Sequence, residues 1–138
     1  GLANNGDWNS GRQGYVGLNT SVGYMTFDFA DGPVNEFSVF TNYAPVNYGD
    51  FVIEAYGLDD VLLESYNIST LATIATSGSN NGAYRGISRG DNDIHSFRLY
   101  NAYIVADDLS FSRVPEPSTL AIFALGIMGL ASRKFKKQ

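Results

Sequence analysis

Two short runs, Phe51-Val-Ile-Glu-Ala-Tyr-Gly57 and Val61-Leu-Leu-Glu-Ser-Tyr66, decide the fold class of this chain. Both are rich in the β-branched, aromatic and other apolar residues that fill half-buried strands. Only Leu58-Asp59-Asp60 separates them, and so short a connection joins antiparallel neighbours. The two runs therefore predict a β-hairpin.

Similar runs lie on both sides of this hairpin. They are Tyr24–Phe29, Glu36–Asn42, Tyr84–Ile87, Ile94–Tyr100 and Tyr103–Ser112. Residues 1–14, rich in Gly, Asn and Ser, indicate a loop or an incomplete first strand, and residues 68–82 indicate a weak strand or a flexible loop. About eight strands with no 3.6-residue period predict an all-β fold, an antiparallel β-sandwich over residues 1–113.

Residues 114–138, VPEPSTLAIFALGIMGLASRKFKKQ, have a different character. Proline on both sides of Glu116 keeps Pro115-Glu116-Pro117 extended and accessible. Residues 118–132 predict a helix about 22 Å long that is apolar on every side, which a small sandwich cannot enclose. Four cations follow it: Arg133, Lys134, Lys136 and Lys137. Because their stems can snorkel, we expect a transmembrane helix whose basic end stays in the cytoplasm.

The order of these three parts resembles the PEP-CTERM sorting signal of Gram-negative bacteria. An ordinary single-span anchor would share the apolar run and the cations but would contain the tripeptide only by chance. The resemblance implies export across the inner membrane, transient anchoring, and recognition and trimming by an exosortase near Pro115–Pro117. The released protein then belongs on the cell surface or outside the cell. Family members tend to accompany exopolysaccharide production, so exopolysaccharide is an implied partner.

The last strand-like run gives a second resemblance. Ile104–Phe111 places an Asp-Asp pair before Leu-x-Phe, directly ahead of the tail, as the closing strand of many PEP-CTERM proteins does. With Glu54–Gly57 and Tyr84–Ile87 it is similar to the jelly-roll, galactose-binding-like sandwiches of such proteins. This resemblance implies a jelly-roll body followed by a sorting signal at residues 114–138.

Composition limits the function classes. All fourteen acidic residues lie within residues 1–117, whose five Arg are the only cations there. So acidic a body is repelled by nucleic acid, which we exclude as a partner. The absence of Cys excludes disulfides, thiolate metal sites and a Cys nucleophile. The chain starts at Gly1 without a basic-then-apolar leader, so we expect that its natural start is missing.

Asp107 and Asp108 are the first candidates for a metal site. Strand parity puts Asp107 on one face with Leu109 and Phe111, and a carboxylate among apolar neighbours must be hydrogen-bonded or bind a cation. In the structural interpretation, Asp107 accepts backbone N–H groups and Asp108 faces water. In the functional interpretation the pair binds Ca²⁺, and Asp7 helps to supply the roughly six to eight oxygens that calcium needs.

Catalysis finds little support. His95 is the only histidine, and neither a nucleophile elbow nor a zinc-binding helix motif is present. A paired-carboxylate glycosidase is an alternative because Glu36, Glu54 and Glu64 lie on expected strands, although alternating glutamates are typical of a solvated face. Asp91-Asn92-Asp93 lacks the rest of a calcium loop and indicates a turn. We therefore expect a protein that is not an enzyme.

Tyr43 and Tyr48 are the candidate sugar-binding residues, since both fall in a loop of Asn, Pro and Gly. Exposed rings stack on sugar faces, whereas most of the other aromatic residues are expected to fill the sheet interface. Two compatible functions result. The first is a non-catalytic surface or matrix protein sorted by exosortase, and the second is a calcium-dependent carbohydrate-binding module.

Overall fold

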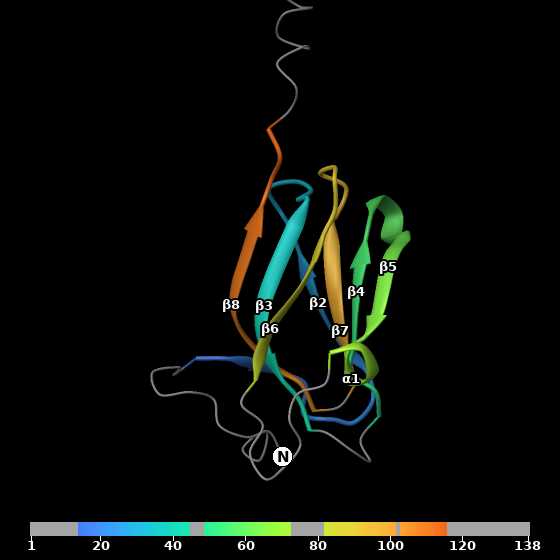
Figure 1. The fold of residues 1–138 in the computed structure, drawn as a ribbon, viewed down its shortest axis with the longest axis vertical. Coiled ribbons are helices and arrows are strands. Elements are labelled where there is room, and N and C mark those ends of the chain that lie inside the picture. The colour runs from blue at the N-terminus through green and yellow to red at the C-terminus, as the bar shows by residue number, and fades with distance from the viewer. Residues whose placement is uncertain (1–13, 45–48, 73–81, 102, 116–138) are drawn as a thin grey trace, which may run out of the picture.

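A computed structural model describes residues 14–44, 49–72, 82–101 and 103–115 of this chain. This part of the chain folds around one core and confirms the predicted hairpin (Figure 1). Its strands are β1 (Val16–Gly17), β2 (Tyr24–Asp28), β3 (Glu36–Asn42), β4 (Val52–Tyr56), β5 (Leu62–Asn67), β6 (Ala83–Ser88), β7 (Ser96–Tyr100) and β8 (Val105–Ser112). A 3-10 turn, η2 (Leu58–Asp60), joins β4 to β5, and a short helix, α1 (Ile68–Leu71), follows β5.

The strands pair as one long hairpin rolled into two sheets. β1 pairs with β8, β2 with β7, β3 with β6 and β4 with β5, each antiparallel. The pairs β3·β8 and β4·β7 then complete two four-stranded sheets. Sheet A has the order β1-β8-β3-β6 and sheet B the order β2-β7-β4-β5. The predicted antiparallel sandwich is confirmed, and the strand order is that of a jelly roll.

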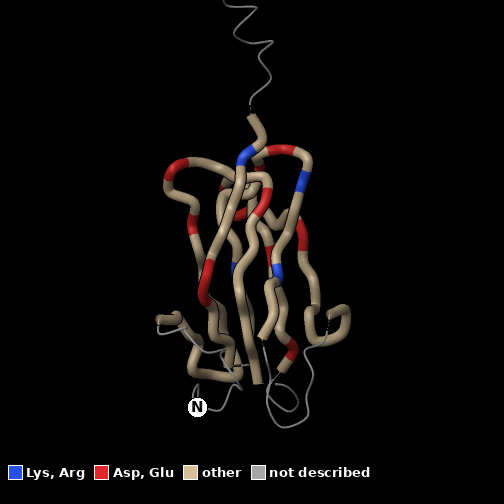
Figure 2. The backbone as a smooth tube through the Cα atoms, turned by 60° about the vertical axis from the view of Figure 1, so that its left-hand side comes forward, with Lys and Arg blue, Asp and Glu red and all other residues tan. Residues whose placement is uncertain are grey.

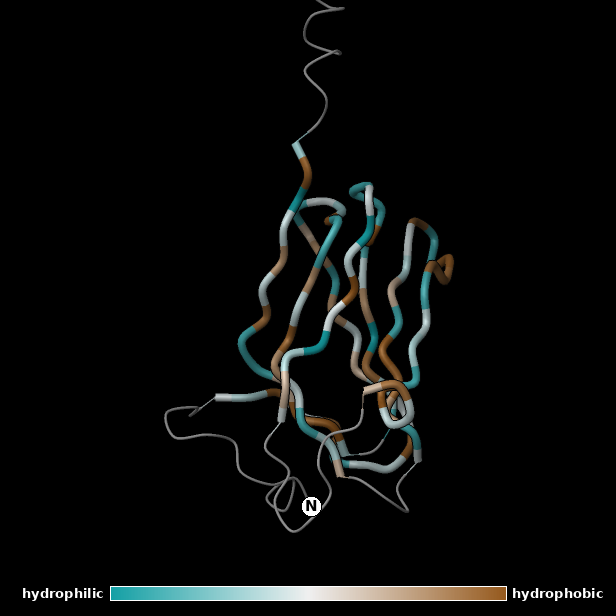
Figure 3. Tube along the Cα trace, in the orientation of Figure 1, coloured by the Kyte–Doolittle hydropathy of each residue, from teal (hydrophilic) through white to brown (hydrophobic). Residues whose placement is uncertain are grey.

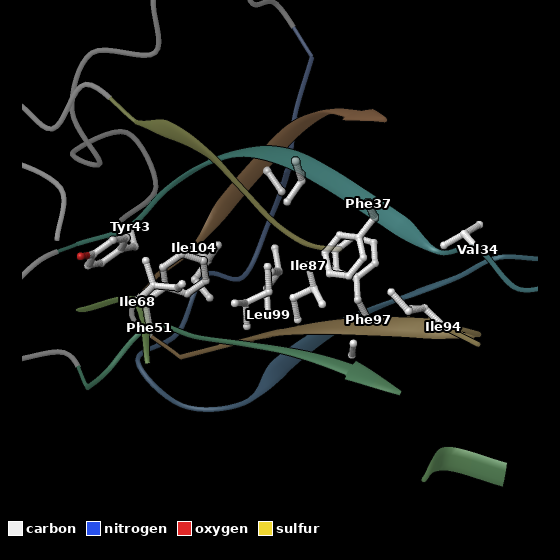
Figure 4. Close-up of a cluster of buried hydrophobic side chains, with 14 residues drawn as sticks. Val34, Phe37, Tyr43, Phe51, Ile68, Ile87, Ile94, Phe97, Leu99 and Ile104 are labelled. Atoms are coloured by element: carbon white, nitrogen blue, oxygen red, sulfur yellow. The ribbon is translucent and has the colours of Figure 1, made fainter. Parts of the chain in front are cut away.

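The core lies between the inner faces of the two sheets (Figure 4). Hydrophobic and hydrophilic residues alternate along much of the strands (Figure 3). Because successive side chains of a strand point to opposite faces, this alternation supplies the apolar residues of the core between the sheets. Phe37 and Ile87 come from sheet A, and Phe97 and Leu99 come from sheet B. Each of these four side chains is at most 4 % exposed. The alternation expected for residues 24–29 is confirmed, with Met25, Phe27 and Phe29 packed on the core.

Two elements differ from expectation. The two-residue strand β1 is too short to leave a periodic pattern in the sequence. Ile68–Leu71, expected as a weak strand or loop, forms α1 instead. The Ile68 side chain is buried in the core, its N–H donates to the Phe51 carbonyl, and the Ser69 hydroxyl accepts the Phe51 N–H. These tertiary contacts with Phe51 decide the local structure, which propensity alone does not favour.

Candidate functional site

The chain leaves the sandwich at one end, which we call the exit end. It is formed by the last residues of β8, the β2–β3 turn, η2 and the β6–β7 loop, and it lies at the top of Figure 1. The Arg113 guanidinium, just past β8, donates to the carbonyls of Pro33 and Gly32 at 3.0 and 2.9 Å. It also lies 5.6 Å from the centre of the Phe111 ring. Arg113 therefore attaches the end of β8 to the β2–β3 turn.

The next residue, Val114, is held by the β6–β7 loop. Its N–H donates to the Asn92 side-chain oxygen at 2.9 Å, and its carbonyl accepts from the Asn92 side-chain nitrogen at 2.8 Å. One carboxamide thus satisfies both backbone groups of Val114, as a neighbouring strand would. The Asp91-Asn92-Asp93 segment is a turn that binds the backbone of Val114, a role that its composition alone did not indicate.

An ion-pair cluster fixes the loop that holds Asn92. Arg89 donates from Nε and Nη2 to the two carboxylate oxygens of Asp93, each at 2.8 Å, and from Nη1 to Glu64 of β5. These hydrogen bonds from Arg89 lower the pKa of Asp93 below its ordinary value. Acidic and basic positions lie close together in the loops at this end (Figure 2). Because the planar guanidinium of Arg89 binds both carboxylate oxygens of Asp93, it fixes the orientation of the loop as well as balancing the Asp93 charge.

A shallow depression of about 230 Å³ lies beside β8 on sheet A. Glu36, Ser38, Ser110, Phe111 and Ser112 line it. It offers hydroxyl groups and a single carboxylate, which is too few ligands for a calcium ion.

Tyrosines gather on the outer face of sheet B. The Arg98 guanidinium lies over the Tyr56 ring at 4.1 Å and near the Tyr24 ring at 5.3 Å. The Tyr24 and Tyr100 rings lie 5.2 Å apart, and Arg98 also donates to Asp60 at 2.9 Å. We call Tyr24, Tyr56, Arg98 and Tyr100 the tyrosine face. Arg98 and Tyr100 alternate along β7 with the core residues Phe97 and Leu99, so their side chains lie on the opposite, outer face of sheet B.

Hydrogen bonds organise the less exposed part of this face. The Tyr56 hydroxyl donates to Glu54 at 2.5 Å and lies 2.8 Å from the Tyr100 hydroxyl, while Ser65 donates to the other Glu54 oxygen at 2.9 Å. Burial, followed by the hydrogen bonds to Glu54 and Tyr100, raises the pKa of Tyr56 above its ordinary value. Tyr56 therefore stays a neutral donor that holds Glu54 in place. Tyr24, by contrast, is 53 % exposed.

The expected environment of Asp107 is wrong. The β3·β8 register shifts between Ser38 and Phe40, so Asp107 pairs with Phe40, whereas Phe111 pairs with Phe37. Paired residues share a face, and β3 alternates, so Asp107 and Phe111 lie on opposite faces of sheet A. The cause is an extra residue at Asp108, whose φ is 49°. A two-residue period cannot reveal such a bulge.

Each aspartate has a local partner in the described residues. Asp107 accepts the N–H of Asp108 at 2.8 Å, and Asp108 accepts the Tyr84 hydroxyl at 3.1 Å. Within residues 14–44, 49–72, 82–101 and 103–115, no three His, Cys, Asp or Glu side chains are arranged to hold a metal ion. Asp7 lies outside these ranges, so the calcium site stays a prediction.

The expected exposure of Tyr43 is also wrong. Tyr43 is 3 % exposed, belongs to the core cluster and packs on Phe51 with ring centroids 4.9 Å apart. A ring in this position cannot stack on a sugar. Tyr48 lies outside the described residues, so its proposed contact is not tested.

The three candidate catalytic glutamates lie on different surfaces. By strand pairing, Glu36 is on the outer face of sheet A and Glu54 on the outer face of sheet B. Glu64 pairs with Arg89 at the β5 edge. These three residues therefore do not form the carboxylate pair across one cleft that a glycosidase requires.

The exit end coincides with the start of a recognisable motif, since residues 113–137 match the family model of the PEP-CTERM protein-sorting motif. The chain carries a PEP-CTERM sorting motif. It begins at Arg113, the residue that the β2–β3 turn holds. The motif implies recognition by exosortase and export to the cell envelope or surface. No curated protein matches the chain.

Most of the PEP-CTERM motif lies beyond the described residues. Pro115 is described, whereas Glu116, Pro117 and the cations Arg133, Lys134, Lys136 and Lys137 are not. The predicted helix at residues 118–132 also falls there. Among the residues that the structure does describe, no helix is long and apolar enough to cross a membrane.

Proposed function

We propose that this chain is a non-catalytic protein of the cell surface or extracellular matrix, anchored transiently by residues 118–132 and processed by exosortase near Pro115–Pro117. The observation that carries the proposal is the match of residues 113–137 to the sorting motif, directly after the last strand of the sandwich. A jelly-roll cargo that ends where its sorting motif starts can be trimmed without loss of any strand. In this interpretation the motif is a substrate, and the catalytic residues belong to the exosortase.

Replacement of the tripeptide tests this function. In a host with an exosortase, a variant with alanine at Pro115, Glu116 and Pro117 should accumulate as a full-length, membrane-retained form, whereas the unmodified chain loses its tail. A variant with alanine at Ser118 and Thr119 serves as the control, because it changes adjacent residues outside the tripeptide. Normal maturation of the triple variant, measured by mass spectrometry of the C-terminus, would contradict the proposal.

A second function, carbohydrate binding, is supported by the tyrosine face. Tyr24 is 53 % exposed, with the Arg98 guanidinium beside its ring as a hydrogen-bond donor and the Tyr100 hydroxyl, whose proton goes to Tyr56, as an acceptor. An exposed ring flanked by polar groups suits a neutral sugar, which can stack on the ring and form hydrogen bonds with these groups through its hydroxyls. The acidic body disfavours a polyanionic glycan, so we propose a neutral polysaccharide.

Affinity gel electrophoresis of the full chain in detergent tests this function. A neutral polysaccharide in the gel should retard the protein, and Tyr24→Ala should abolish the retardation. Tyr66→Ala is the matched control, since Tyr66 is 40 % exposed and donates to Glu64, away from the tyrosine face. Retardation that EDTA removes would support the calcium-dependent form. Retardation that Tyr24→Ala leaves intact would exclude the tyrosine face.

A further inference from the structure

Val114, the residue directly before the sorting tripeptide, is hydrogen-bonded to the sandwich through its backbone. Its N–H and its carbonyl both pair with the Asn92 carboxamide, at 2.9 and 2.8 Å. Pro115 favours this arrangement, because a residue that precedes proline is restricted to extended conformations. Turning the carboxamide over would replace both hydrogen bonds by repulsive contacts, so one orientation satisfies Val114.

Contacts that do not involve Val114 hold the Asn92 loop in place. Arg89 binds Asp93 through two parallel hydrogen bonds, and the Asp93 N–H donates to the Asp91 carbonyl at 3.0 Å. The loop is closed on its other side by the bridge between Ile94 and Val34. With the loop fixed at both ends, little conformational freedom is lost when Asn92 binds Val114.

A peptidase needs the groups that Asn92 occupies. Proteins commonly bind an extended peptide through its backbone N–H and carbonyl groups, as an added strand. The backbone N–H and carbonyl of Val114 are already hydrogen-bonded to Asn92. The Arg113 guanidinium is hydrogen-bonded to the carbonyls of Gly32 and Pro33. Residues up to Val114 are therefore withheld from a protease, and Pro115 is the first residue outside these contacts.

We propose that Asn92 and Arg113 form a clamp that sets the upstream limit of processing, so that the scissile bond lies C-terminal to Val114. Asn92 acts as a positioning residue for the substrate segment. The link to exosortase rests on the proposed function, whereas protection of the Arg113–Val114 bond does not. The clamp would keep β8 intact while the tail is removed.

Trypsin tests the clamp without an exosortase, because it cleaves after arginine. The readout is the rate of cleavage at Arg113–Val114 divided by the rate at Arg98–Leu99, measured by mass spectrometry on the native full chain in detergent. The second bond lies inside β7 and reports global unfolding, so the ratio isolates the clamp. Asn92→Ala should raise the ratio about tenfold, which corresponds to about 1.4 kcal/mol for the two lost hydrogen bonds.

Two further variants make this result specific. Asp91→Ala is the matched control in the same turn and should leave the ratio unchanged. Asn92→Asp keeps the acceptor for the Val114 N–H but loses the donor to its carbonyl, so it should give an intermediate ratio. An unchanged ratio in both Asn92 variants would overturn the clamp, even where the overall rates rise.

A host with an exosortase then tests the limit of processing. The mature unmodified chain should end at Val114 or beyond it, and Asn92→Ala should add termini upstream of Val114. A mature terminus at or before Arg113 in the unmodified chain would overturn the clamp. If no chain is trimmed while the trypsin ratio still rises in Asn92→Ala, the clamp stands and the proposed function fails.

Discussion

The ring of Phe37 in sheet A lies nearly parallel to the ring of Phe97 in sheet B, with centroids 4.1 Å apart and an interplanar angle of 14°. The other side of Phe97 is used as well, since Phe27 stacks on it at 4.6 Å and 5°. The Phe97 ring therefore packs against Phe27 of its own sheet and against Phe37 of the opposite sheet. Phe37 and Phe97 are 1 % and 0 % exposed, so this contact is wholly within the core.

Removal of the Phe97 ring should destabilise the sandwich strongly. Phe97→Ala leaves a cavity between the Phe27 ring of sheet B and the Phe37 ring of sheet A, and we expect a loss of about 3–5 kcal/mol in the free energy of unfolding. Phe111→Ala is the control, because that ring is 51 % exposed, and it should cost well under half as much. Urea unfolding of the full chain measures both. Equal losses would contradict the packing role of Phe97.

The close approach of β6 to β3 at Gly86 leads to a second prediction. A methyl group at Gly86 would lie 2.0 Å from the Phe37 carbonyl oxygen and 2.9 Å from the Ser38 Cα, so β6 would have to move away from β3. Gly86→Ala should therefore cost about 3 kcal/mol, the upper end of the usual range for overpacking. Gly90→Ala meets nothing within 4 Å and should stay within about 0.5 kcal/mol of the unmodified chain. A well-folded Gly86→Ala variant would show that the β3·β6 contact is looser than described.

Much of the fold was predictable because its strands alternate. Glu36–Asn42 and the hairpin around Leu58–Asp60 follow directly from residue type and spacing. The bulge at Asp108 was not predictable, since a single inserted residue reverses the faces downstream without changing composition. α1 was missed because its stability comes from Ile68 and Ser69 contacts with Phe51, distant in the sequence.

The candidate functional sites show the same division: local motifs could be predicted from the sequence, and contacts between distant residues could not. The sorting motif was recognisable because it is linear, with its parts in a fixed order. Asn92 was not, because its role depends on Val114, which lies 22 positions along the chain. Tyr43 was misassigned because its loop composition suggested exposure, whereas its ring packs on Phe51. Contacts between distant segments decide these cases.

The Arg89 cluster makes the stability depend on pH. Hydrogen bonds from Arg89 lower the pKa of Asp93 in the folded state relative to the unfolded chain. The pair is therefore stabilising above the ordinary Asp pKa of about 3.9, and this contribution is lost as the pH falls through the lower folded value. Asp93→Asn should be less stable than the unmodified chain at pH 7, and the difference should shrink at pH 3.

Urea unfolding at the two pH values measures this difference. Asp91→Asn is the control, because Asp91 lies in the same turn and does not pair with Arg89 in the described part of the chain. Its effect should be small and similar at both pH values. A difference for Asp93→Asn that persists unchanged at pH 3 would contradict a stabilising role of the ionised pair.

The cations of the tail should determine the orientation of the anchored form. Arg133, Lys134, Lys136 and Lys137 follow the apolar run with no acid among them, and positive charge near the end of a span is retained in the cytoplasm. Replacement of all four by Glu should remove this bias, so that a C-terminal epitope becomes accessible to external protease in spheroplasts. A variant that exchanges Arg for Lys and Lys for Arg keeps the charge and should keep the epitope protected. Full protection in the Glu variant would show that the sandwich or the tripeptide, rather than the cations, sets the orientation.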